Sequence, residues 1–144
     1  PIEIALPEKR GVLADKPSET DVLGELGLRA YFKTWDHPDG DAAAAGWGGD
    51  RFWVWKRADR DLLLWVTRWD SDSDAGEFLE AYLDTLPDRF PTSKIEAAGA
   101  NAWRVRLAGA HWLYVSRRGR GVDIIQGARL QEISGITALF PRAQ

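Results

Sequence analysis

Three aspartates at alternate positions, Asp70, Asp72 and Asp74, have the spacing of the first three carboxylate ligands in a calcium-binding loop. Such a loop also needs a glycine at its sixth position and a bidentate glutamate at its twelfth. Alanines occupy both of these positions, at Ala75 and Ala81. We therefore predict no calcium site and assign the acidic stretch to the N-terminus of a helix, where negative charge interacts favourably with the helix dipole.

The glycine-rich stretch GWGGDR at residues 46–51 has the composition of a phosphate-binding loop. Phosphate loops run from a strand through the glycines into a helix, because the helix N-terminus holds the anion. Here a short helix is expected before the glycines and a strand after them, and no Lys-Ser/Thr pair follows. We predict instead that Gly46 ends the helix over 42–45 and that the other glycines let Trp47 fold over a sheet.

No catalytic residues and no cofactor or metal site are predicted elsewhere. The loop at 36–41, DHPDGD, offers one histidine and three aspartates, but aspartate is common in such turns because its side chain closes them. A metal there would need a distant ligand, and His111 is the second of only two histidines. The chain has no cysteine and no G-x-S-x-G motif, and its 22 acidic residues single out no pair for glycoside hydrolysis.

Basic and aromatic residues gather near the last predicted hairpin, a combination that can bind single-stranded nucleic acid. They are Arg104, Arg106, Arg117, Arg118 and Arg120, with Trp103 and Trp112. The net charge of −3 argues against this function, so we expect no nucleic-acid partner. We also expect no membrane insertion, because no apolar run approaches the ~20 residues of a transmembrane helix.

Eight tryptophans in 144 residues are the most unusual feature of the composition. Trp53, Trp55, Trp65 and Trp69 lie on two neighbouring predicted strands, and we expect them to form a ladder on one sheet face. Two interpretations remain open. A helix over 74–86 covers this face as part of the core, or the face is partly open for a sugar, a peptide or another domain.

Hydrophobic periodicity predicts the elements that position these residues. An N-terminal arm or edge strand is expected over 1–17 and a single domain over 18–144. Helices are predicted at 18–35, 42–45, 71–90 and 130–140. The third begins with Ser71 as its cap, and Pro87 is expected to end its periodic run.

Strands are predicted at 50–57, 62–69, 94–109, 111–118 and 122–128. The first two form a hairpin with apolar residues on both faces, which favours a central position in a covered sheet. The predicted fold class is therefore α+β, with an antiparallel sheet of about five strands covered by two or three helices. The chain starts at Pro1 and has no methionine, so we expect it to be a piece of a longer protein.

Several stretches together resemble the C-terminal region of an uncharacterised prokaryotic envelope protein family. They are PIEIALP, DVLGELGLRAYF, AAAAGWGGDRFWVW and LLLWVTRWDSDSDAGEFLEAY, followed by the closing strands. The resemblance implies an exported or lipid-anchored protein whose upstream part is similar to an HExxH gluzincin-like metallopeptidase. It therefore implies that this chain is a non-catalytic accessory or interaction domain whose partner is the upstream domain or another protein. The alternative is an independent module that binds a carbohydrate or peptide on its tryptophan-lined face.

The most specific part of the resemblance is a structural signature formed by Trp47, Asp50, Arg51 and Asp70. The Trp-Asp pair at one strand end and the Gly-Asp-Arg stretch at the neighbouring strand start are expected to be adjacent across the hairpin. We predict that Asp50 or Asp70 accepts hydrogen bonds from Arg51, from Arg68 or from an indole N–H, and so ties the sheet to a helix. No catalytic role is implied for these residues.

Overall fold

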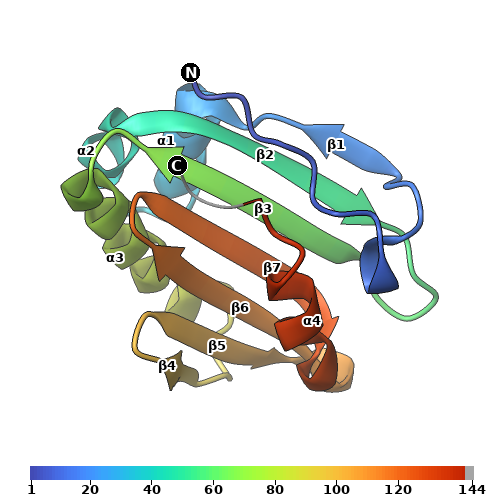
Figure 1. Cartoon of the computed structure of the whole chain (residues 1–144). Coiled ribbons are helices and arrows are strands. Elements are labelled where there is room, and N and C mark those ends of the chain that lie inside the picture. Colours follow the sequence, from blue (N-terminus) through green and yellow to red (C-terminus); the bar gives the residue numbers. More distant parts are fainter. Residues whose placement is uncertain (142–144) are drawn as a thin grey trace.

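One antiparallel sheet of seven strands forms the centre of the protein (Figure 1). A computed structural model describes residues 1–141. The strands lie in the order β1-β2-β3-β7-β6-β5-β4, so that β7 is central. Their bounds are β1 (Glu19–Asp21), β2 (Trp47–Trp55), β3 (Leu62–Trp69), β4 (Ile95–Gly99), β5 (Ala102–Leu107), β6 (His111–Arg118) and β7 (Gly121–Arg129).

Four α-helices and three short 3₁₀ helices complete the described residues. The α-helices are α1 (Gly24–Thr34), α2 (Gly40–Ala45), α3 (Asp72–Arg89) and α4 (Ile133–Thr137). The 3₁₀ helices are η1 (Gly11–Leu13), η2 (Ala108–Ala110) and η3 (Leu130–Glu132). The last three residues of the domain predicted over 18–144 lie outside the described residues.

The α+β class and the antiparallel sheet are confirmed, but the sheet is larger than the five strands predicted. The two additional strands, β1 and β4, are the edges of the sheet: β1 lies in a segment predicted to be helical, and β4 is part of the single strand predicted over 94–109, which a turn at 100–101 divides into β4 and β5. All three residues of β1 and four of the five in β4 are exposed, so neither strand shows the buried alternation on which the prediction depended. The described residues form four α-helices, and each lies in or overlaps one of the four predicted helical segments.

The helix predicted over 18–35 starts later than expected. Residues 19–21 pair with β2, and the Ser18 hydroxyl donates to the Val54 carbonyl instead of capping a helix. By contrast, Ser71 does cap α3, because its hydroxyl oxygen accepts the Asp74 backbone N–H at 3.0 Å. Pro87 does not end α3, which continues to Arg89.

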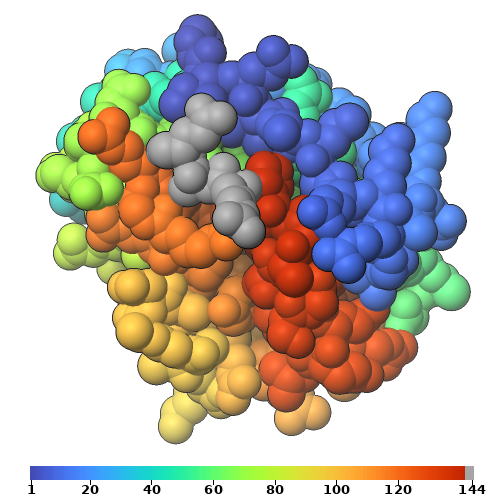
Figure 2. Space-filling view, viewed as in Figure 1, coloured from blue at the N-terminus to red at the C-terminus, as the bar shows by residue number. Residues whose placement is uncertain are grey.

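Helices α1, α2 and α3 lie on one face of the sheet, whereas residues 1–17 and α4 lie on the other (Figure 1). Figure 2 shows the N-terminal segment and α4 side by side over this second face. Residues 1–17 contain no strand among them. They form an extended arm that buries Ile4 and Leu13 against the sheet, and the Ile2 N–H donates to the Gly48 carbonyl.

The arm approaches β2 so closely that only a glycine fits at position 49. A Cβ atom added to Gly49 would overlap the backbone of Ile2. The glycine triplet of 46–51 therefore has two structural uses: Gly46 follows the last residue of α2, as predicted, and Gly49 admits the N-terminal arm.

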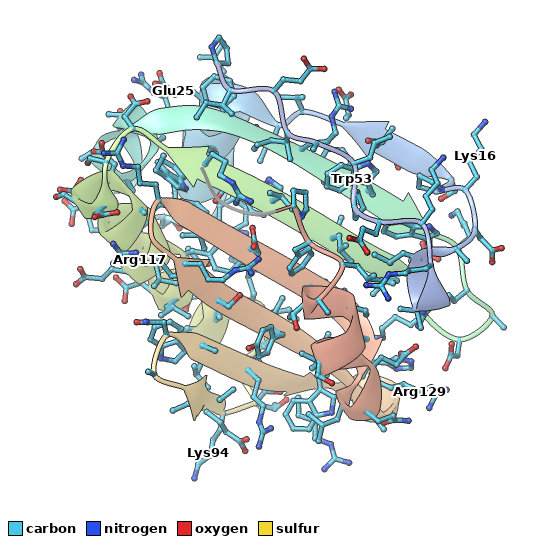
Figure 3. The ribbon with its side chains drawn as sticks, in the orientation of Figure 1. Lys16, Glu25, Trp53, Lys94, Arg117 and Arg129 are labelled. Carbon is cyan, nitrogen blue, oxygen red and sulfur yellow. The ribbon has the colours of Figure 1, made fainter. Side chains whose placement is uncertain are left out.

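The prediction that four tryptophans form a ladder on one sheet face is wrong. Trp53 is opposite Leu64 in the β2–β3 pairing and Trp65 is opposite Phe52. Because side chains alternate along each strand, Trp53 and Trp55 face the N-terminal arm and α4. Trp65 and Trp69 face the opposite side, toward α1, α2 and α3. Figure 3 shows Trp53 on β2 behind the arm. All four are buried.

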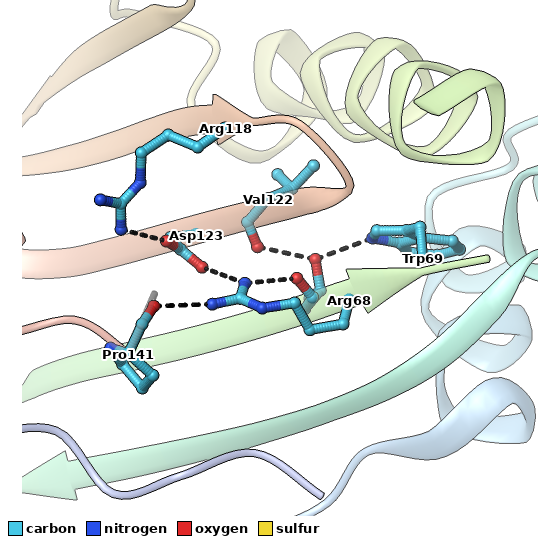
Figure 4. Close-up of polar contacts among 7 residues, drawn as sticks. Arg68, Trp69, Arg118, Val122, Asp123 and Pro141 are labelled. Carbon is cyan, nitrogen blue, oxygen red and sulfur yellow. Dashed lines mark hydrogen bonds and ion pairs between the residues drawn. The ribbon is translucent and has the colours of Figure 1, made fainter. Parts of the chain in front are cut away.

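A buried ion pair joins β3 to β7 in the centre of the sheet, and its arginine also binds the Pro141 carbonyl (Figure 4). Arg68 on β3 donates to Asp123 on β7 at 3.0 Å and to the Pro141 carbonyl at 2.8 Å. Arg118 also donates to the Asp123 carboxylate, at 3.3 Å. Burial raises the pKa of Asp123 above its usual value, although both arginines favour the charged carboxylate.

None of the helices within residues 1–141 combines the length and the hydropathy that crossing a membrane requires.

Candidate functional site

The carboxylate of Asp50 is a hydrogen-bonding centre between the sheet and α1. It accepts the indole N–H groups of Trp47 (3.0 Å) and Trp65 (2.9 Å) and the backbone N–H groups of Leu23 and Gly24 (both 2.9 Å). The two backbone donors begin α1, where no local side chain caps the helix. Asp50 is 3% exposed, so its four hydrogen bonds are shielded from water.

This geometry confirms that Asp50 accepts hydrogen bonds from indole N–H groups and ties the sheet to a helix. The other signature residues have different partners. Within residues 1–141, the Asp70 side chain makes no hydrogen bond, but its backbone N–H donates to the Gly46 carbonyl and its carbonyl accepts from Arg120. Arg51 donates to the Thr20 hydroxyl.

Next to the Asp50 cluster lies a cavity of about 270 Å³ between α1, α3 and the sheet, which we call the Arg89 pocket. Its wall on the sheet includes Phe52, Leu63 and Ile124. Three aromatic rings also line it: Tyr31 of α1, Trp65 of β3 and Tyr82 of α3. The ring of Trp65 therefore belongs to the pocket, while its N–H belongs to the Asp50 cluster.

The cationic group of the pocket is Arg89, in the last turn of α3. Its Nη1 donates to the hydroxyls of Tyr31 and Tyr82, both at 3.0 Å, and its Nη2 donates to Gln126 Oε1 at 3.1 Å. The guanidinium carbon also lies 5.6 Å and 5.8 Å from the ring centroids of the two tyrosines. Residues 82 and 89 are seven apart, about two helical turns, which directs both toward the same side of α3.

None of the groups that accept hydrogen bonds from Arg89 is a carboxylate. Burial raises the pKa of Tyr82 to about 12, so its hydroxyl remains protonated. Burial also disfavours the charge of Arg89, but Tyr82 and Tyr31 more than offset this effect, and the pKa of Arg89 lies above its usual value. Among the described residues, no carboxylate lies within 4.0 Å of this guanidinium. The pocket therefore has a positive charge with neutral partners.

Of the tryptophans predicted to form an interaction surface, only Trp65 lines this pocket. Trp53 and Trp55 are buried under the N-terminal arm and α4, and Trp69 stacks on Phe78 with ring centroids 4.5 Å apart. The sequence predicted no functional role for Tyr31, Tyr82 or Arg89. The pairing of Tyr31 with Arg89 spans 58 residues, so no local pattern reports it.

The loop at 36–41 lies at a different place. His37 Nε2 is 3.1 Å from Asp84, and its Nδ1 accepts the Asp39 backbone N–H, so the ring joins this loop to α3. The described part of the chain contains no group of three or more His, Asp or Glu side chains arranged to hold a metal ion.

The family model of Domain of unknown function (DUF8575) matches residues 12–137, which include β1 through α4, the Asp50 cluster and the Arg89 pocket. Neither the curated proteins nor the solved structures gave a match to this chain. The chain is therefore a member of the DUF8575 family, a domain of unknown function.

Proposed function

We propose that the chain is a non-catalytic binding domain whose Arg89 pocket takes a small organic anion with an aromatic or aliphatic body. The observation that carries the proposal is a guanidinium with neutral partners at the end of an aromatic pocket. Ligand sites commonly combine apolar walls with a small number of polar groups that fix the orientation of the ligand.

The hydrogen bonds of Arg89 leave part of its donor capacity for a ligand. A guanidinium has five N–H groups, and three of them are used by Tyr31, Tyr82 and Gln126. Within residues 1–141, Nε–H and one N–H on Nη2 have no partner, and a carboxylate accepts two such parallel hydrogen bonds well. Phe52, Leu63 and Ile124 offer apolar contact for the rest of the ligand.

The side chains of the pocket support binding better than catalysis. Its polar groups are two tyrosine hydroxyls, one arginine and one glutamine amide. Nucleophilic catalysis needs a nucleophile next to a general base, and the lining offers no such pair. We therefore assign a binding role to this site.

The test is isothermal titration calorimetry with 4-phenylbutyrate and its uncharged analogue 4-phenylbutanol. Arg89→Gln is expected to weaken binding of the acid by about tenfold or more, because a charge-assisted hydrogen bond contributes ~1.5–3 kcal/mol. Binding of the alcohol should change little. Arg106→Gln, an exposed arginine on β5, is the matched control and should bind the acid as the unaltered protein does.

Two results would contradict the proposal. Equal affinity of Arg89→Gln and the unaltered protein for 4-phenylbutyrate would show that the guanidinium does not hold the anion. Absence of binding of both compounds to the unaltered protein would remove the pocket as a site for such ligands.

The wider context of the proposal comes from the resemblance described above. The chain would act as an accessory domain of a larger envelope protein, attached to a metallopeptidase-like domain, and the pocket would contact that domain or its substrates. An independent binding module is the alternative, and it would use the same pocket, because the four tryptophans of the hairpin are buried. A blot of native cells with an antibody against this chain separates the two: we expect a band well above 16.1 kDa, and a band near that mass would favour the independent module.

A further inference from the structure

We infer that the natural occupant of the Arg89 pocket is the C-terminal residue of a polypeptide, with its terminal carboxylate at Arg89 and its preceding residues on the apolar rim of the pocket. This inference rests on the proposed function and specifies the class of ligand.

The rim is the first observation. Three large apolar side chains at the start of α1 are exposed: Val22 (41%), Leu23 (36%) and Leu26 (81%). Leu23 also lines the pocket, and Leu26 is its neighbour three residues along the helix. Apolar surface therefore continues from the inside of the pocket to the outside of α1, and contiguous exposed apolar surface commonly marks an interaction site.

The position of Leu23 at the entrance of the Arg89 pocket depends on Gly27. A Cβ atom added to Gly27 would overlap the Cγ and Cδ1 atoms of Leu23. The Leu23 side chain can therefore lie along the helix surface between the pocket and the exposed rim. The backbone N–H of Leu23 is held at the same time by Asp50, so the entrance is fixed to the sheet.

The size of the pocket is the second observation. At about 270 Å³ it lies just below the ~300–1,000 Å³ of ordinary small-molecule sites. This volume suits one apolar side chain with its carboxylate. A small free acid would leave Leu26 and Val22 exposed to water, whereas the residues before the C-terminus of a peptide would cover them. Capture of a terminal carboxylate is an established mode of peptide recognition.

The test compares four probes by isothermal titration calorimetry: a hexapeptide that ends in phenylalanine with a free carboxylate, the same peptide with a C-terminal amide, 4-phenylbutyrate, and dodecanoate. We expect the free-acid peptide to bind about tenfold or more tightly than the amide. Leu26→Ser is expected to weaken binding of the free-acid peptide about three- to tenfold and to leave the affinity for 4-phenylbutyrate unchanged, since Leu26 does not line the pocket. Leu6→Ser, which changes an exposed leucine of the N-terminal arm, is the matched control.

The outcomes separate this inference from the proposed function. If 4-phenylbutyrate binds through Arg89 but the peptide binds no more tightly, or Leu26→Ser has no effect on the peptide, the inference is wrong and the proposed function stands. If dodecanoate binds more tightly than the peptide and Leu26→Ser weakens dodecanoate binding, the rim takes an acyl chain and the peptide is excluded. If no acid binds, both fail.

Discussion

Replacing Asp50 with alanine is expected to lower the free energy of unfolding by about 4 kcal/mol and to abolish ligand binding at the Arg89 pocket. The substitution leaves four N–H donors without their acceptor: two indoles, from Trp47 and Trp65, and the backbone groups of Leu23 and Gly24. Each buried donor without a partner costs ~1–3 kcal/mol, and relaxation with entry of water reduces the sum. A loss of this size is a large part of the ~5–15 kcal/mol that stabilises a typical domain.

The effect on binding follows from the position of the same donors. Leu23 and Trp65 line the Arg89 pocket, and both are oriented by hydrogen bonds to Asp50. Loss of the carboxylate also removes the acceptor that organises the first turn of α1, where the apolar rim lies. Stability and binding should therefore fall together, although Asp50 itself does not line the pocket.

Urea unfolding followed by tryptophan fluorescence measures the change in stability, and two variants make the result specific. Asp50→Asn keeps one acceptor oxygen and places an amide NH₂ against the donors, so a smaller loss of about 2 kcal/mol is expected. Asp70→Ala is the matched control within the same structural signature, because its backbone bonds are retained, and a change of less than about 0.5 kcal/mol is expected. An Asp50→Ala protein as stable as the Asp70→Ala protein would show that the cluster does not hold sheet and helix together.

Strong local patterns predicted the central elements of this fold well. The β2–β3 hairpin is rich in aromatic and β-branched residues, α3 has helical apolar periodicity, and Ser71 with Asp74 marks the start of α3. The turn that separates β4 from β5 within the strand predicted over 94–109 was missed, as was the edge strand β1, which exposes all three of its side chains and is held mainly by backbone pairing with β2. Such pairing leaves no hydrophobic pattern in the sequence.

The tryptophans show a different limit of sequence reasoning. Their spacing within each strand was sufficient to show that Trp53 and Trp55 share a face, as do Trp65 and Trp69. Whether the two pairs share the same face depends on the register of the hairpin, and a shift of one residue reverses the answer. The observed register places Trp53 opposite Leu64, so the pairs lie on opposite faces.

The candidate site was predictable only in part. The GWGGDR stretch drew attention to Asp50, whose role as an acceptor for indole N–H groups is confirmed. The Arg89 pocket depends on contacts between α1, α3 and β7 that are 37 to 58 residues apart along the chain. An arginine in the last turn of a helix is also favourable for the helix dipole alone, so its sequence position gave no reason to expect a binding site.

Replacing Arg68 with methionine is expected to lower the free energy of unfolding by ~3–5 kcal/mol, because it leaves the buried carboxylate of Asp123 without its closest partner. Arg118 remains 3.3 Å from the carboxylate, but its side chain is half exposed and cannot replace a buried guanidinium. The change also removes the donor to the Pro141 carbonyl, so that the end of the described chain loses its bond to β3.

The loss of stability caused by Arg68→Met should increase as the pH rises. Burial already raises the pKa of Asp123, and loss of Arg68 should raise it further. For a carboxyl group whose pKa is higher in the folded than in the unfolded state, the free energy of unfolding falls as the pH rises from the pKa of the unfolded state toward the pKa of the folded state. The deficit of Arg68→Met relative to the unaltered protein should therefore be larger at about pH 8 than at about pH 5.

A double-mutant cycle separates the pair from its surroundings. Asp123→Leu alone should also be destabilising, because Arg68 would keep its charge in a site where it is 5% exposed. The double variant Arg68→Met/Asp123→Leu should be more stable than either single variant, since apolar side chains of similar volume often replace a buried ion pair with little loss. Urea unfolding at about pH 8 measures all four proteins. If the two single losses instead add up in the double variant, Arg68 and Asp123 are not coupled, and the cost of Arg68→Met comes from its bond to Pro141.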